Sequence, residues 1–279
     1  MSTAADPGPL RSVLFVPGDR SDMIAKVTRT RPDAVVVDLE DGVAADRKDV
    51  ARAGTHDAFD LIRRSDDRCA VYVRVNTVGS PWFADDVAIG IPHGAGVVLP
   101  KCESPADVAA VWVEGRPIIA GIESARGLVH ANDIAAATGI VALYIGSEDY
   151  AADVGGRRTR AGLEVLFARS AVVAAARAAG VAPIDQVHVA VHDDESFRAE
   201  CADGLSLGFA GKMCIHPRQV ELLHEVLTPT EDELAAAMRI LDAFESSRRA
   251  GSGVCLVDGK MIDEPLVRQA RAVRDRAAR

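Results

Sequence analysis

The sequence has no long apolar run. None of its 279 residues belong to a stretch of about 18 apolar side chains, the length that a membrane-spanning helix needs. The first residues, MSTAADPGP, have neither a basic stretch nor an apolar core. We therefore expect neither a secretory signal peptide nor a membrane-spanning helix.

Closely spaced cysteines are also missing. The five cysteines lie far apart, with no CxxC pair among them. An odd, scattered set in a chain of this length indicates reduced thiols, and it predicts a cytoplasmic protein. They are Cys69, Cys102, Cys201, Cys214 and Cys255.

An excess of basic residues is the third absence. Asp and Glu total 41 against 32 Lys and Arg, and the formal net charge is −9. This balance argues against a general affinity for nucleic acid or for anionic membranes. It leaves room for an anionic small molecule, because one local basic cluster is enough to bind it.

Eight short, β-branched apolar segments recur along the chain, and Ala- and charge-rich stretches with helical spacing separate most of them. Near-continuous apolar segments are typical of strands that are buried on both faces of a parallel sheet. Strands that alternate with helices predict an α/β fold, here a (β/α)₈ TIM barrel. The segments are 12–16, 34–37, 70–75, 96–99, 118–122, 142–145, 187–191 and 211–215, and the helical stretches include 47–62, 105–113, 127–137 and 161–179.

Two further motifs are missing. A doubly wound open sheet, the alternative fold, would need a GxGxxG turn after the first strand, where this chain has Pro17-Gly18-Asp19-Arg20. Neither Ser124 nor Ser147 lies in a GxSxG sequence, so a serine nucleophile at these positions has little support.

The chain is longer than a bare barrel requires. We predict a barrel over residues 10–229 and a C-terminal extension over 230–279. The extension is expected to contain a helix over 230–249, a glycine-punctuated segment over 251–265 and a final helix over 266–278. Residues 246–253 are a candidate hinge.

Charged residues follow most of the predicted strands. In a TIM barrel these positions form one rim, which carries the active site. Glu123 and Asp149 stand 26 positions apart, about one βα repeat, and so fall on neighbouring strands. Two carboxylates with no nearby Cys or His suit a hard cation with oxygen ligands, of which Mg²⁺ is one that commonly takes one or two carboxylates. The alternative is that each acid caps a helix or pairs with an arginine.

Arg74 ends the third predicted strand. An arginine at this point can direct its planar fork at a carboxylate or a developing enolate. It can also pair with Asp38 or Glu40, whose side chains point the same way because the strand period is two. The two roles are compatible, since an acid can orient a catalytic arginine.

Basic residues also surround the end of the first strand. Arg20 and Lys26, together with Phe15, form a phosphate-site candidate that is weak on spacing alone. We expect His216 to orient the loop after the last strand rather than to act as a base.

Nine motifs in order resemble the citrate lyase β-subunit-like family of the HpcH/HpaI aldolase superfamily, which includes malyl-CoA and citramalyl-CoA lyases. The match extends from about Ser12 to Ala270. The motifs are LFVPGDR, DLEDGV, YVRVNT, SPWF, VLPK, GIESARG, GSEDY, GFAGKMCIHPRQ and DGKMIDEP.

The resemblance implies a TIM barrel with Mg²⁺ held by Glu123 and Asp149, and with Arg74 in contact with the substrate. It implies that a C-terminal lid carries Asp263 into the site of a neighbouring subunit, which requires a homo-oligomer, with a trimer expected. It also implies two sets of supporting residues. One set would line the site for CoA or substrate: Phe15, Arg20, Lys26, Ile215 and His216. The other set would orient the residues that contact the substrate, such as Arg74: Asp38, Glu40 and Asp41.

The activity implied is Mg²⁺-dependent cleavage or formation of a 3-hydroxyacyl-CoA, with a 2-oxo acid and an acyl-CoA as partners. Malyl-, citramalyl-, β-methylmalyl- and citryl-CoA are not distinguished, and hydrolysis of the thioester stays open. The alternatives are a β subunit of a multi-subunit citrate lyase acting on a carrier-bound thioester, a CoA-independent 2-oxo acid aldolase, and a non-catalytic sensor.

Overall fold

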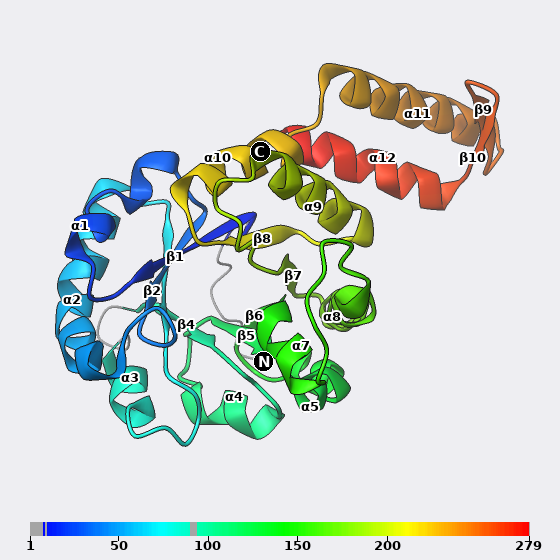
Figure 1. The fold of residues 1–279 in the computed structure, drawn as a ribbon. Coiled ribbons are helices and arrows are strands. Elements are labelled where there is room, and N and C mark those ends of the chain that lie inside the picture. The colour runs from blue at the N-terminus through cyan, green and yellow to red at the C-terminus, as the bar shows by residue number, and fades with distance from the viewer. Residues whose placement is uncertain (1–7, 9, 90–93, 279) are drawn as a thin grey trace. The chain divides into compact units, whose positions relative to one another are not determined.

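The computed structural model describes residues 8, 10–89 and 94–278, and Figure 1 shows its course. The chain forms two compact units that divide between residues 223 and 224. The predicted boundary at 229/230 stays a prediction. Within the described ranges no helix is long and apolar enough to cross a membrane.

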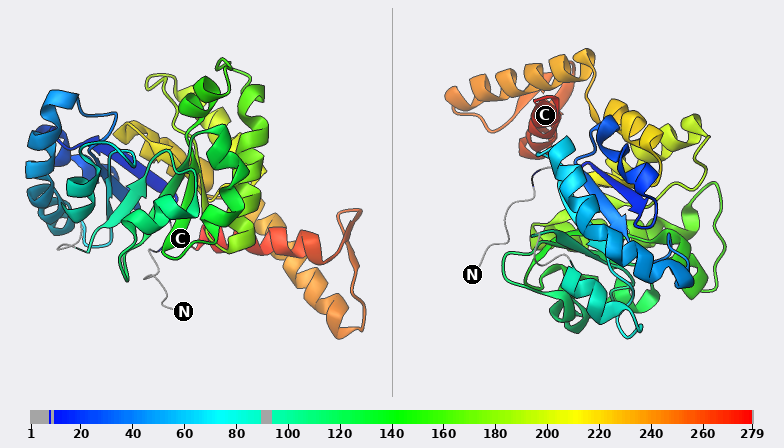
Figure 2. Two further views of the ribbon diagram at one scale, coloured as in Figure 1. Left: turned by 90° about the horizontal axis from the view of Figure 1, so that it is seen from below. Right: turned by 90° about the vertical axis from the view of Figure 1, so that its left-hand side faces the viewer.

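The first unit is a closed barrel of eight parallel strands in sequential order, surrounded by helices (Figures 1 and 2). β8 closes the ring by pairing with β1, where Ser12 lies opposite Lys212. The predicted TIM barrel is confirmed, and the open sheet was the wrong alternative. The strands are β1 (Ser12–Pro17), β2 (Ala34–Asp38), β3 (Ala70–Arg74), β4 (Gly96–Leu99), β5 (Ile118–Ile122), β6 (Ile140–Ile145), β7 (Ala182–Asp185) and β8 (Gly211–Cys214).

Helices connect the strands and cover the barrel (Figure 2). The stretch predicted as one helix over 127–137 is two short helices, α5 and α6, that meet at His130. Gly180 ends α8 in the left-handed conformation, as its position predicts. The helices are α1 (Ser21–Ile24), α2 (Lys48–Ser65), α3 (Phe83–Ile89), α4 (Pro105–Val111), α5 (Ala125–Val129), α6 (Ala131–Ala135), α7 (Ser147–Asp153), α8 (Leu163–Ala179), α9 (Asp194–Leu207) and α10 (Pro217–Leu227), with 3-10 turns η1 (Val27–Thr30) and η2 (Ala45–Arg47).

Side chains from alternate strand positions fill the barrel interior. Val36, Tyr72, Ile119 and Tyr144 belong to one buried cluster there. A Cβ at Gly96 would collide with the Tyr72 ring, so a small residue on β4 makes room for a large one on β3. This exchange of small and large residues packs the core and leaves the polar groups to the strand ends.

The seventh strand differs from its prediction. β7 is Ala182–Asp185, whereas the predicted segment 187–191 is a loop in which Val189 is 62% exposed. The chain enters the barrel immediately after Gly180, and the Pro183 carbonyl accepts a ladder hydrogen bond from the Ala210 amide at 2.8 Å. Proline lowers the strand propensity of this stretch, which explains the error.

The second unit is built around two helices and a hairpin. α11 (Glu231–Arg249) begins with a capping box between Thr230 and Glu233. β9 (Cys255–Val257) and β10 (Lys260–Ile262) pair antiparallel, and α12 (Glu264–Ala277) follows. The glycine-punctuated segment is thus a hairpin. Its turn, Asp258-Gly259, has positive φ at both residues, as a two-residue hairpin turn requires.

Candidate functional site

Arg74 lies at the end of β3, and its guanidinium pairs with two buried acids. It donates to both carboxylate oxygens of Asp38 at 2.7 and 2.6 Å, and it forms an ion pair with Glu40 at 2.8 Å. The ring of Phe15 packs against the guanidinium, with its centroid 4.7 Å from Cζ. Both predicted partners of Arg74 are therefore present, and β1, β2 and β3 fix its orientation together.

The loop after β2 is held in place by its own first residue. Asp38 accepts hydrogen bonds from the amides of Glu40 and Gly42 at 2.8 and 2.9 Å. The buried Lys48 ammonium donates to the carbonyls of Leu39 and Glu40, both at 2.7 Å. These bonds satisfy the loop backbone and aim Glu40 at the rim.

Glu123 follows β5 and is only 4% exposed. Its carboxylate accepts a short hydrogen bond from the Tyr144 hydroxyl, which reaches up from the barrel interior. A Cβ at Gly146 would lie 2.5 Å from Glu123 Cγ, so glycine is needed at the end of β6 for this side chain to fit. Burial, supported by the charge of Glu40, raises the pKa of Glu123 to about 7 although the Tyr144 hydrogen bond opposes it.

Lys101 is the cation on which the rim acids converge. Its ammonium lies 2.6 Å from Glu40, 3.2 Å from Asp41, 3.7 Å from Asp149 and 4.0 Å from Glu123. The residue has φ +47°, a left-handed conformation that is unusual outside glycine. Burial lowers the pKa of Lys101, but the hydrogen bond to Glu40 and the nearby carboxylates outweigh burial and raise it.

Asp149 stands in the first turn of α7, and its side chain is 46% exposed. Its neighbour Glu148 is directed elsewhere and accepts a hydrogen bond from Arg158 at 2.9 Å. No group of three or more His, Cys, Asp or Glu side chains in the described ranges is arranged to hold a metal. Glu123 and Asp149 nevertheless fit a hard divalent cation, because Mg²⁺ commonly takes one or two carboxylates and completes its coordination with water and substrate oxygens.

The basic residues after β1 lie on the surface. Arg20 donates to both carboxylate oxygens of Asp22 at 2.9 and 3.0 Å, and Lys26 is exposed at the start of η1. Within the described ranges neither forms a contact with Arg74, Glu123 or Asp149. Of the predicted CoA-binding group after β1, only Phe15 contacts a rim residue, and the roles of all three stay predictions.

The residues after β8 lie at the other side of the first strand. Ile215 is 39% exposed, and its amide donates to the buried Gln219 at 2.9 Å. His216 accepts a hydrogen bond from the Arg218 amide at 3.1 Å. This bond agrees with the predicted role of His216 in shaping the loop.

Asp263 belongs to the second unit, where it precedes α12. It stands at the N-cap position but makes no side-chain capping bond, and its carboxylate has no ion-pair partner among the described residues. The side chain is half-buried and directly follows the hairpin, and it has no structural bond within the described part of its own unit.

Two residues of the rim were not among the predicted site residues. Lys101 follows β4 on the rim, but no role could be predicted for it, because its approach to four acids depends on the reach of its side chain. Tyr144 lies within β6, where strand alternation places it in the barrel interior. Only the structure shows that its hydroxyl reaches Glu123.

Comparison with known proteins identifies the relatives of this chain. Residues 11–217 match the model of the HpcH/HpaI aldolase/citrate lyase family. The chain is 46% identical over 277 residues to a citrate lyase subunit beta-like protein from Deinococcus radiodurans, covering 96% of this chain and 98% of that protein. It is 36% identical over 271 residues to a (3S)-malyl-CoA thioesterase from Cereibacter sphaeroides, covering 94% and 93%.

A solved structure shares the fold over nearly the whole chain. It is the protein CitE from Mycobacterium tuberculosis in complex with magnesium, acetoacetate and coenzyme A, with a TM-score of 0.85 and 33% identity. The match covers 98% of this chain and 100% of that chain. On these matches, the chain belongs to the HpcH/HpaI aldolase/citrate lyase family.

Proposed function

We propose that this protein is a Mg²⁺-dependent carbon–carbon lyase that cleaves, or forms, a 3-hydroxyacyl-CoA carrying a carboxylate on its carbinol carbon. One observation carries the proposal. Glu123 and Asp149 lie close to the same cation, the Lys101 ammonium, at 4.0 and 3.7 Å, on the rim that also holds Arg74. The rim therefore offers a place for positive charge beside a fixed guanidinium fork.

Its relatives support the choice of metal and substrate. The CitE structure holds magnesium, a 3-oxo acid and coenzyme A together, and the Cereibacter relative acts on malyl-CoA. Bound between Glu123 and Asp149, Mg²⁺ would supply Lewis acidity to the carboxylate and hydroxyl oxygens of the substrate. The exposed Asp149 and the buried Glu123 would hold it from two sides.

Arg74 stabilises the negative charge that develops during the reaction. When the carbinol hydroxyl gives its proton to water and the bond between the α-carbon and the carbinol carbon breaks, the carbinol carbon becomes the carbonyl of the 2-oxo acid and the thioester fragment becomes an enolate. The Arg74 guanidinium, fixed by Asp38 and Glu40, places hydrogen-bond donors where that negative charge appears. Since the fork is already oriented, its stabilisation is greater for the transition state than for the substrate.

Asp263 completes the proton transfers. In the cleavage direction it protonates the enolate carbon to give the acyl-CoA, and in condensation it removes that proton. We place it in the site of a neighbouring subunit, which makes the active form a homo-oligomer. Phe15, Arg20, Lys26, Ile215 and His216 would contact the CoA portion at the β1 and β8 side of the rim.

A panel of malyl-, citramalyl-, β-methylmalyl- and citryl-CoA, each offered with Mg²⁺, tests the proposal. The lyase releases a 2-oxo acid together with an acyl-CoA, whereas thioester hydrolysis releases free CoA and the hydroxy acid. Release of a 2-oxo acid from at least one thioester is the expected result. Turnover of none of the four, or hydrolysis without cleavage, would contradict it.

A second candidate is a β subunit of a multi-subunit citrate lyase, because the first relatives include proteins with that name. Such a subunit would act on a thioester attached to a carrier protein. Turnover of free CoA esters by the purified chain alone favours the independent enzyme. Activity only after addition of a carrier-bound citryl thioester favours the subunit.

A further inference from the structure

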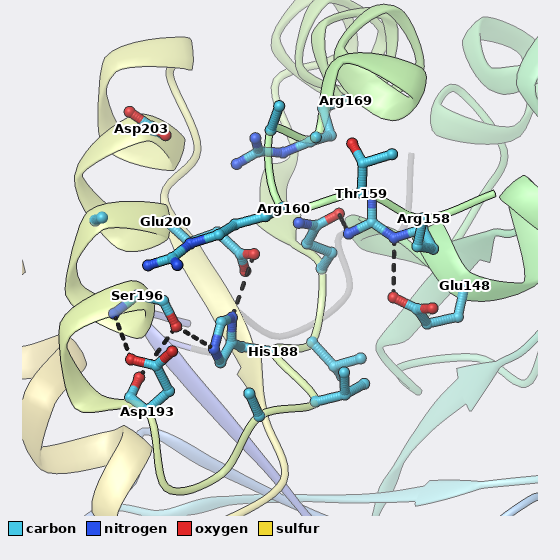
Figure 3. Close-up of a pocket in the computed structure, with 17 residues that line it drawn as sticks. Glu148, Arg158, Thr159, Arg160, Arg169, His188, Asp193, Ser196, Glu200 and Asp203 are labelled. Atoms are coloured by element: carbon cyan, nitrogen blue, oxygen red, sulfur yellow. Dashed lines mark hydrogen bonds and ion pairs between the residues drawn. The ribbon is translucent and has the colours of Figure 1, made fainter.

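A cavity lies beside α9, where residues that follow β6 and β7 line it (Figure 3). Its volume is about 400 Å³. The loop after α7, the loop after β7 and the first turns of α9 enclose it, and neither Arg74, Glu123 nor Asp149 is among its lining residues. Its walls come from the same segment, 187–191, that the sequence wrongly predicted as a strand.

Three lining side chains form a hydrogen-bonded series. Ser196 Oγ lies 3.0 Å from His188 Nε2, and His188 Nδ1 lies 3.3 Å from a Glu200 carboxylate oxygen. Figure 3 shows His188 between the other two, with Ser196 and Glu200 both on α9. A hydroxyl, an imidazole and a carboxylate in this order are the arrangement of an activated serine nucleophile.

Glu200 fixes the imidazole in the form that this arrangement requires. Burial raises the pKa of Glu200, but the charge and hydrogen bond of Lys212 at 2.5 Å outweigh burial and lower it, so the carboxylate is ionised. An ionised carboxylate beside Nδ1 favours the tautomer with the proton on Nδ1. Nε2 can then accept the Ser196 proton at 3.0 Å, and the Asp193 carbonyl, 3.3 Å from Oγ, is the competing acceptor.

The chain of charges continues into the barrel. Lys212, 1% exposed, also lies 3.6 Å from Asp185, which pairs with Arg169 at 2.6 Å. The two positive charges of Lys212 and Arg169 thus balance the two negative charges of Asp185 and Glu200. Glu200 is the residue of this network that contacts His188. Buried charges are costly to maintain, so a network that ends on an imidazole in a cavity is a candidate functional site.

Arg160 supplies an uncommitted positive charge. It lines the cavity near Asp193, the acid that caps α9 three residues before Ser196; hydrogen bonds from Ser196 chiefly lower the pKa of Asp193, and the Arg160 charge adds to them. Arg160 forms no hydrogen bond or ion pair with any residue in the described ranges. Its guanidinium is therefore available to an anionic group placed near Ser196.

From these contacts we infer that Ser196, His188 and Glu200 form an acyl-transfer site for a small ester or thioester whose acyl group carries a carboxylate for Arg160. Ser196 Oγ attacks the acyl carbonyl while His188 takes the hydroxyl proton. The bond to the alcohol or thiol breaks, and His188 returns the proton to that leaving group. Water then attacks the acyl-serine and gives a proton to His188. The bond between the acyl carbon and Ser196 Oγ breaks, His188 returns the proton to Oγ, and the acid is released.

Two aryl esters test the inference without any metal, namely p-nitrophenyl acetate and mono-p-nitrophenyl glutarate. In EDTA the wild type should release p-nitrophenol from both, faster from the anionic glutarate, and tryptic peptides should carry the acyl group on Ser196. Ser196→Ala should lower the rate about a hundredfold or more. Arg160→Gln should remove the preference for glutarate.

The matched control is Ser206→Ala, because Ser206 lies on the same helix and, among the described residues, its hydroxyl bonds to the Ala202 carbonyl alone. It should hydrolyse both esters like the wild type. Acyl groups found on other residues only, or a Ser196→Ala variant with the wild-type rate, would overturn the inference.

Discussion

At the scale of single residues, Glu123 is the rim acid whose pKa is shifted furthest. Its pKa of about 7 lies above the ordinary 4.5, chiefly because burial disfavours the charged form. The folded protein therefore binds this proton more tightly than the unfolded chain does. The resulting stability is complete below pH 4.5 and is lost as the pH rises to about 7.

The prediction is a fall in the free energy of unfolding over that window when metal is removed with EDTA. The contribution of Glu123 should reach about 3 kcal/mol at most. Glu123→Gln keeps the volume and removes the titration, so its unfolding free energy should decline less. Urea unfolding at several pH values measures this difference, and parallel curves for the two proteins would contradict it.

Lys101 competes with a metal for the same acids. Lys101→Met keeps most of the side chain and removes the charge that lies among Glu40, Glu123 and Asp149. In EDTA, where no metal can take the place of the ammonium, the variant should lose about 2 kcal/mol of stability, because the buried Glu40 and Glu123 carboxylates lose a nearby positive charge.

The same variant should bind Mg²⁺ more tightly than the wild type, since no ammonium has to move. Isothermal titration calorimetry with Mg²⁺ measures this directly. A weaker affinity would mean that Lys101 supports the metal site instead of competing for it.

At the scale of elements, the junction of β6 and α7 positions Glu123 from a neighbouring strand. In Gly146→Ala the new Cβ would meet Glu123 Cγ at 2.5 Å and Cδ at 2.8 Å. The carboxylate has to move, and Mg²⁺ affinity should fall about tenfold or more, while the barrel still folds. Mg²⁺ titration with circular dichroism as the check on folding tests this.

Gly54→Ala is the control for that substitution. Gly54 lies inside α2, where a Cβ would come no closer than 3.7 Å to the Gly18 carbonyl. The variant should gain about 0.5–1 kcal/mol in stability and keep its Mg²⁺ affinity. Equal Mg²⁺ affinities for both glycine variants would show that contact with Glu123 is not what matters.

Strand ends were predictable because their register is a property of the chain. β3 and β5 begin at the predicted residues, and Arg74 and Glu123 therefore stand at the strand ends where the sequence placed them. β7 was misplaced because a proline in a short strand conceals it, and the better alternation of 187–191 belongs to a loop. The hairpin turn is encoded locally, because Asp258-Gly259 is an Asp-Gly pair, a sequence typical of two-residue hairpin turns.

Contacts between side chains were less predictable. Arg74 with Asp38 followed from strand alternation, but the reach of Lys101 and Tyr144 depends on rotamers and on the glycines that make room for them. The series of Ser196, His188 and Glu200 needed the correct position of β7. No spacing in the sequence brings a loop residue against the first turns of α9.

At the scale of the whole molecule, the proposed site needs two chains. If Asp263 acts in a neighbouring subunit, Glu123→Gln and Asp263→Asn should each be nearly inactive alone. Co-expressed and assembled at random, they should recover about one quarter of wild-type turnover, because some sites then combine an intact Glu123 with an intact Asp263. Measuring 2-oxo acid release from the mixed oligomers tests this, and mixtures as inactive as their parents would place Asp263 in its own chain's site.

The most direct test of the metal-dependent lyase is 2-oxo acid release from the best thioester of the panel, in Mg²⁺ and in EDTA, by the wild type and by Asp149→Asn. The account predicts turnover by the wild type in Mg²⁺ alone. EDTA or Asp149→Asn should lower it about a hundredfold or more, with the fold intact. Undiminished release of the 2-oxo acid in EDTA, or by Asp149→Asn, would contradict it.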